Sequence, residues 1–121
     1  MNPMHELRRI RRQQLPYYLK VFNRFTDKPI GYIGDVSPEG LLLVSQLPML
    51  VGARFEFRLK IPAQTGQLHC IDFSGDCKWS REDVNPGHFD SGFALLAPPA
   101  DYLQLVDSLR RYFTFSPRAG S

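Results

Sequence analysis

The sequence predicts an all-β fold with one C-terminal helix, arranged as a six-stranded antiparallel β-barrel. Six short segments are apolar or alternate between apolar and polar residues, and turn signals separate them. The connections are short, which favours antiparallel pairing. One amphipathic segment follows, and it can cover an open end or edge of the barrel. The chain has 121 residues, 43% of them hydrophobic, so we expect one domain with a sizeable core.

The first three predicted strands lie between residues 16 and 45. In the first, apolar residues fall mostly at alternate positions: Tyr17, Leu19, Val21 and Phe25. A turn signal over Thr26–Pro29 separates it from a second strand at Ile30–Ile33. After another turn at Asp35–Gly40 comes Leu41–Ser45, whose nearly continuous apolar run predicts a strand buried on both faces.

The next three predicted strands lie between residues 54 and 96. Alternation is clearest in the fourth, where charged residues separate Phe55, Phe57, Leu59 and Ile61. The fifth, Leu68–Trp79, is long, and we expect a bulge or bend at Ser74-Gly75. A loop predicted over Arg81–Asp90 leads into the sixth strand, Phe89–Leu96.

A helix is predicted after Pro98-Pro99, because apolar residues then recur at helical spacing: Tyr102, Val106, Leu109 and Phe113. Asp101 suits its first turn and two arginines suit its last. We therefore divide the chain into three parts. These are a basic N-terminal arm at residues 1–15, a barrel with its helix at 16–113, and a tail at 114–121 that we expect to be flexible.

Positive charge is concentrated in the arm. The chain carries 15 basic and 12 acidic residues, a net charge of +3. Four of the basic residues fall within five consecutive positions: Arg8, Arg9, Arg11 and Arg12. Without these four, 11 basic residues face 12 acidic ones, a balance of −1. This distribution excludes a uniformly basic nucleic-acid-binding surface and leaves a localised anion site open.

The sequence predicts neither export nor membrane insertion. No apolar run approaches the ~18 residues of a membrane span, and no apolar signal region follows Met1–Leu7. Cys70 and Cys77 are too few for a disulfide framework, and their odd spacing puts them on opposite faces of one strand. We therefore expect a cytoplasmic protein with reduced thiols and no membrane span.

Catalysis is not expected either. The three histidines show no metal-ligand spacing with the cysteines, and the adjacent His69 and Cys70 point to opposite faces of their strand. Gly31 and Gly34 lack the lysine and the helix that would complete a phosphate loop. We expect neither a metal site nor a cofactor.

The arginine run has a general and a specific interpretation. It can be a solvated arm, or one drawn nonspecifically to RNA, DNA or acidic lipid. However, all four residues are arginines, whose planar guanidinium grips phosphate bidentately and stacks on aromatic rings. Arg8 and Arg12 are four positions apart, so they share a face in a helix or a strand and can close on one ligand.

Two further features also have two interpretations. The Asp35–Gly40 turn can simply cap its own backbone, with Gly40 at a positive φ, or its carboxylate and hydroxyl can meet a base or a phosphate. Trp79, the only tryptophan, can pack in the core or at its rim. It can also serve as a stacking platform for a base, because it lies at the end of a strand before a loop.

Together these residues resemble the PilZ domain family. The resemblance is carried by Arg8-Arg9-x-x-Arg12 and, about twenty residues later, by Asp35-x-Ser37-x-x-Gly40. It extends from about Glu6 to Phe113 and includes Gly92-Phe93 in the last strand and the closing helix. The resemblance implies a six-stranded β-barrel with a C-terminal helix, in agreement with the strand count made from the residues.

The resemblance also implies binding of cyclic di-GMP, a bacterial second messenger with two guanines and two phosphates. Arg8 and Arg12 would hold phosphates and stack on or hydrogen-bond to guanine, with Arg9 beside them. Asp35 would accept hydrogen bonds from guanine, and Ser37 would bond to guanine or phosphate. Gly40 would allow the tight turn. Trp79 belongs to neither motif, and we include it in the candidate site because it lies at the end of a strand before a loop.

We therefore expect a non-catalytic cyclic di-GMP receptor that changes the conformation of its arm on binding and signals to an unknown partner protein. No specific nucleic acid is expected as a partner. Two alternatives stay open. One is a general nucleic-acid-binding barrel that uses its arm electrostatically. The other is a PilZ-fold protein-interaction module that binds no nucleotide.

Overall fold

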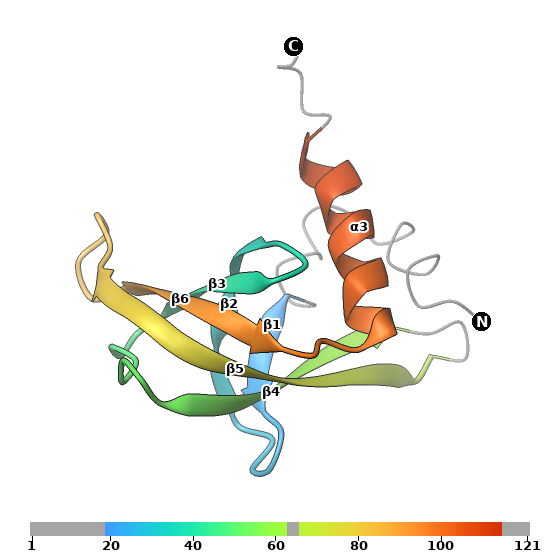
Figure 1. The fold of residues 1–121 in the computed structure, drawn as a ribbon, viewed down its shortest axis with the longest axis horizontal. Helices are drawn as coiled ribbons and strands as arrows, with labels where there is room; N and C mark the ends of the chain where they lie inside the picture. The colour runs from blue at the N-terminus through green and yellow to red at the C-terminus, as the bar shows by residue number, and fades with distance from the viewer. Residues whose placement is uncertain (1–18, 63–65, 115–121) are drawn as a thin grey trace.

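The described part of the chain folds into a closed antiparallel barrel with a helix over it (Figure 1). The structure is a computed structural model that describes residues 19–62 and 66–114. The strands follow the barrel in the order β1-β2-β3-β6-β5-β4, and this confirms the predicted fold class. The element bounds are β1 Lys20–Asn23, β2 Pro29–Val36, β3 Gly40–Ser45, β4 Arg54–Pro62, β5 Leu68–Glu82, β6 Phe89–Leu96 and α3 Ala100–Thr114. No helix among the described residues has the length and apolar character that crossing a membrane requires.

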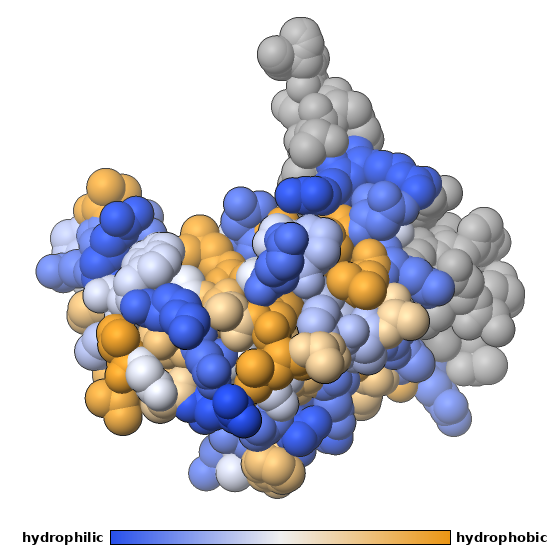
Figure 2. Space-filling model, viewed as in Figure 1, coloured by the Kyte–Doolittle hydropathy of each residue, from blue (hydrophilic) through white to orange (hydrophobic). Residues whose placement is uncertain are grey.

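The β4–β5 pair illustrates why alternating residues form these strands. Facing outward, Arg58 pairs with Asp72 at 2.8 Å and Arg54 with Asp76 at 2.9 Å, across the register that joins these residues. Hydrophilic side chains accordingly form a band across this face in Figure 2. Alternate residues face inward and are buried: Phe57, Leu59, Ile61, Ile71 and Phe73. Each such large apolar side chain contributes about 1.5–3 kcal/mol on burial.

The core continues from the barrel into the helix through a chain of aromatic rings. The rings of Phe93 and Phe57 lie 5.0 Å apart, those of Phe57 and Phe73 5.4 Å, and those of Phe73 and Tyr102 4.8 Å. The predicted helix is confirmed, and its inner face is fully buried at Tyr102 and Leu105. The helix therefore covers one end of the barrel core.

The predicted bulge in β5 lies at another position. Gly75 pairs regularly with Leu95, and the register shifts instead between Cys77 and Trp79. Gly75 is present for packing, because a Cβ there would lie 3.0 Å from a methyl carbon of Leu95 and 3.4 Å from the ring of Phe57. The glycine signal thus marks a crowded core position and not a break in pairing.

Three smaller expectations are also corrected. Phe25 is 75% exposed, because the Asn23 side chain accepts hydrogen bonds from the amides of Phe25 and Thr26 and so ends β1 in a turn. The strand β3 is buried on one face only, since Leu42 is partly exposed where Leu41 is buried. The loop predicted from Arg81 is shorter, because β5 continues to Glu82.

The two cysteines lie on opposite faces of β5, as predicted. Cys70 is exposed and Cys77 is buried. Burial raises the pKa of the Cys77 thiol, so this sulfur stays protonated.

Candidate functional site

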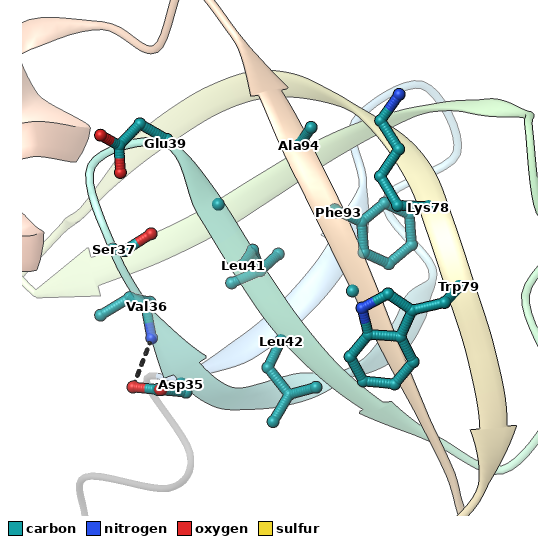
Figure 3. A pocket seen from close by; sticks show the side chains of 12 residues that line it. Asp35, Val36, Ser37, Glu39, Leu41, Leu42, Lys78, Trp79, Phe93 and Ala94 are labelled. Carbon is teal, nitrogen blue, oxygen red and sulfur yellow. Dashed lines mark hydrogen bonds between the residues drawn. The ribbon is translucent and has the colours of Figure 1, made fainter.

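A pocket of about 350 Å³ lies on the outside of the barrel, between the β2–β3 turn and β5 (Figure 3). The strands β3 and β6 form its floor, the turn forms one side, and β5 forms the other. Its lining residues are Asp35, Val36, Ser37, Glu39, Gly40, Leu41, Leu42, Lys78, Trp79, Gly92, Phe93 and Ala94. The pocket therefore brings together four residues that the sequence singled out separately: Asp35, Ser37, Gly40 and Trp79.

The turn is fixed by its own hydrogen bonds. The Ser37 amide donates to the Gly40 carbonyl at 3.0 Å, and the Gly40 amide donates back to the Ser37 carbonyl at 3.3 Å. The Val36 amide donates to the Asp35 carboxylate at 2.9 Å, as Figure 3 shows. A carboxylate offers about four lone-pair sites, so Asp35 keeps capacity for a ligand.

Gly40 is required for a reason other than the expected one. Its φ does not lie in the positive range, unlike the φ of Gly52 or Gly87. Instead, a Cβ at this position would lie 2.9 Å from the carbonyl oxygen of Phe93. Glycine here lets β3 approach β6 closely, and the two strands pair from Gly40↔Ala94 onward.

The helix also holds the turn. The Tyr102 side chain is fully buried, and its hydroxyl lies 3.3 Å from the Ser37 carbonyl and 3.1 Å from the Gly40 carbonyl. Burial, and then the negative charge of Asp35, raises the pKa of Tyr102. The phenol therefore stays protonated as a donor at neutral pH, and it ties α3 to the edge of the pocket.

Trp79 is not a core residue. The bulge in β5 leaves both Lys78 and Trp79 on the outer face, and Trp79 is 39% exposed. Its indole lies across its register partner on β6, where a Cβ on Gly92 would be 2.3 Å from the indole Nε1. The absence of a side chain at Gly92 therefore makes room for the ring.

Sequence reasoning missed two charged residues of the pocket. Lys78 is exposed at the rim and forms no ion pair with any residue that the structure describes. Glu39 adds a second carboxylate, at the other end of the turn from Asp35 (Figure 3). Alternation along β5 already predicts that Lys78 faces outward, but nothing in the sequence places it beside a pocket. Glu39 lies inside the Asp35–Gly40 motif, and its position there is a signal that could have identified it.

The charge of the described pocket is net negative. One lysine faces two carboxylates, at Asp35 and Glu39, which gives a balance of −1. These residues alone would repel an anion, so an anionic ligand needs further positive charge. The candidate residues Arg8, Arg9 and Arg12 lie outside the residues that the structure describes.

A smaller pocket of about 170 Å³ adjoins the first. It is lined by Leu19, Ile33, Gly34, Asp35, Val36 and Leu109, so the two share Asp35 and Val36. The Ile33 amide donates to the Leu19 carbonyl at 2.9 Å. The segment that follows the N-terminal arm therefore begins its described course close to Asp35.

Comparison with protein families gives a match over most of the chain. The family model of the PilZ domain covers residues 6–113, a span that contains both motifs and the closing helix. Comparison with curated proteins and with solved structures gives no match.

Proposed function

This chain belongs to the PilZ family, whose domains are generally cyclic di-GMP-binding effector modules, and on that premise we propose that it is a receptor for cyclic di-GMP. One observation carries the proposal. The Asp35-x-Ser37-x-x-Gly40 motif and Trp79, about forty residues further along the chain, line one pocket.

Each group in the pocket suits a part of the ligand. A carboxylate such as Asp35 can accept from the ring and amino N–H groups of a guanine, and the Ser37 hydroxyl can donate to a base or a phosphate. An aromatic face such as that of Trp79 stabilises a stacked base by about 1–3 kcal/mol. The Lys78 ammonium at the rim can approach a phosphate.

The N-terminal arm supplies the charge that the pocket lacks. Arg8 and Arg12 would bind the two phosphates and Arg9 would add to the field, against a described lining of −1. Leu19 lies seven positions after Arg12, and seven extended residues span about 24 Å, so the arm is long enough to bring Arg12 from Leu19 to the neighbouring pocket.

The mechanism we propose is a change in the conformation of the arm. Four arginines within five positions repel one another, and a dianion bound between them offsets that repulsion. The ligand therefore favours the arm conformation in which both Arg8 and Arg12 reach it. The change is driven by the contacts that the ligand makes in this conformation and not in the others. A partner protein would then read the altered surface, and no catalytic step is involved.

Calorimetric titration of the full chain with cyclic di-GMP, beside GMP and a short RNA, tests the proposal. We expect heat with cyclic di-GMP and little with the other two. Asp35→Ala and Arg12→Ala should each weaken binding by about a hundredfold, because each removes a charge-assisted contact. Arg11→Ala is the matched control, since it removes the same charge one position away and should change affinity by less than about threefold.

The outcomes separate the alternatives. RNA binding that depends steeply on salt, and that falls by the same amount whichever arginine is replaced, would indicate a general nucleic-acid-binding barrel. No heat with cyclic di-GMP at tens of micromolar protein would falsify the receptor proposal and leave the protein-interaction module.

A further inference from the structure

The bulge in β5 places Trp79 on the outer face of the barrel, on the same side of the strand as Arg81. After the register shift, Trp79 pairs with Gly92 and Arg81 pairs with Asp90, so both side chains lie on the outer face and both are exposed. The guanidinium carbon of Arg81 lies over the indole, 4.7 Å from the ring centroid. Because Gly92 underlies one face of the ring, we place the guanidinium on the outward face.

Arg81 is held by its contact with the ring and by the charge of Asp90 opposite it, and not by a direct ion pair among the described residues. Elsewhere on the barrel, Arg24, Arg54 and Arg58 each bind a carboxylate at 2.8–2.9 Å. Arg81 has Asp90 opposite it in the register, yet within the described part of the chain it forms no ion pair. Its planar group therefore keeps its in-plane N–H donors available while it lies on the indole.

We propose that Trp79 and Arg81 form a composite platform, with Arg81 as its outer layer, on which a guanine of the bound dinucleotide stacks. This inference rests on the proposed function and adds a residue outside both motifs of the family. Bases stack on guanidinium planes as well as on aromatic rings. A stacked Arg81 also brings positive charge to the edge of a pocket whose described lining is net negative.

An alternative role for Arg81 predicts the opposite effect of its removal on ligand affinity. A guanidinium that merely covers the indole would have to move before a base could stack there, and its removal would strengthen binding. Substitutions at this one position therefore decide between the two roles.

The experiment compares Arg81→Lys and Arg81→Ala in the full chain by calorimetric titration with cyclic di-GMP. Lysine keeps the charge and loses the plane, so we expect both variants to weaken binding by about fivefold to tenfold. Arg54→Lys is the matched control, because Arg54 lies on the same outer surface but is paired with Asp76 and does not stack on Trp79, and this variant should bind like the wild type.

Fluorescence gives a second readout, since Trp79 is the only tryptophan. Without ligand, Arg81→Ala should shift the emission and Arg54→Lys should not. With ligand, quenching should reach half its maximum at the concentration that calorimetry gives for each variant.

Each outcome decides the inference. If Arg81→Lys binds with wild-type affinity, Arg81 contributes only its charge. If Arg81→Ala binds more tightly, Arg81 merely covers the indole in the free protein. Either result overturns the composite platform. If the wild type binds and both variants match it, only this inference fails. If the wild type itself does not bind, the proposed function fails and takes the inference with it.

Discussion

The hydroxyl of Tyr102 lies 3.1 Å from the carbonyl oxygen of Gly40, 62 residues away in the sequence, so the C-terminal helix and the pocket turn share a hydrogen bond. A second carbonyl, that of Ser37, lies 3.3 Å from the same hydroxyl. This contact makes the position of α3 depend on the turn that carries the Asp35-x-Ser37-x-x-Gly40 motif. It is a direct route by which a ligand on the turn can affect the helix.

Tyr102→Phe should destabilise the protein by about 1 kcal/mol, because the two carbonyls lose a shared donor but keep their partners within the turn. We expect the melting temperature to fall by about 3–6 °C. Affinity for cyclic di-GMP should fall as well, since the turn is less firmly held. Thermal and urea unfolding measure the first effect and calorimetry the second.

Tyr32→Phe is the control for that prediction. Tyr32 is 46% exposed on β2, and its hydroxyl makes no hydrogen bond to the described residues. Equal losses of stability in the two variants would contradict a special role for Tyr102.

Stability should fall at alkaline pH through the same residue. Burial raises the folded-state pKa of Tyr102 above its ordinary value of 10.0, so between the two values the folded state holds a proton that the unfolded state has lost. The unfolded state then binds fewer protons, and stability decreases as pH rises above about 10. Urea midpoints from pH 8 to pH 11.5 should decline more steeply in the wild type than in Tyr102→Phe. Parallel curves would show that other groups govern the decline.

Gly92→Ala should displace the indole of Trp79, because the new Cβ would lie 2.3 Å from Nε1 and 2.5 Å from the adjacent ring carbon. We expect a shift in tryptophan emission and a loss of ligand affinity of about tenfold, the size of one stacking contact. The double variant with Trp79→Ala provides the control. If the clash is the cause, adding Gly92→Ala to Trp79→Ala should cost almost nothing further in stability or affinity.

Lys78→Glu should weaken binding of the dianion by about fivefold at low ionic strength and by less at 0.5 M salt, because the rim charge is exposed and screened. Lys28→Glu makes the same charge change in the turn before β2, at the opposite end of that strand from Asp35. Binding titrations at two salt concentrations compare the variants. An equal loss in both would mean that only net charge matters.

Much of this architecture could be predicted from local sequence pattern. Alternation at Phe55–Ile61 and helical spacing from Tyr102 report which face of an element is buried, so they locate the elements and the core. The segment predicted as a turn, Asp35–Gly40, does join two strands and forms one side of the pocket. Its ends were predicted wrongly, because Asp35 lies on β2 and Gly40 on β3.

The remaining features depend on contacts between distant residues. Gly40 was expected to be needed for its φ and is needed for its approach to Phe93. Arg81 was assigned to a loop, but it lies on β5 and stacks on Trp79. Tyr102 was recognised as buried, whereas its hydrogen-bond partners on the turn cannot be read from a helical repeat.

The bulge at Cys77/Trp79 changes the parity of β5. Before it, odd-numbered residues such as Ile71 and Phe73 face inward; after it the even-numbered Ser80 does, bonding to the buried Ser91. Regular alternation through Lys78, without the bulge, would turn the indole into the barrel and the serine out to solvent. Whether this barrel presents an aromatic ring to its pocket therefore depends on where β5 pairs irregularly with β6 as well as on which residues β5 contains. One irregularity in strand pairing, with no change of residue type, therefore decides whether the same sequence carries the ring outside or inside the barrel.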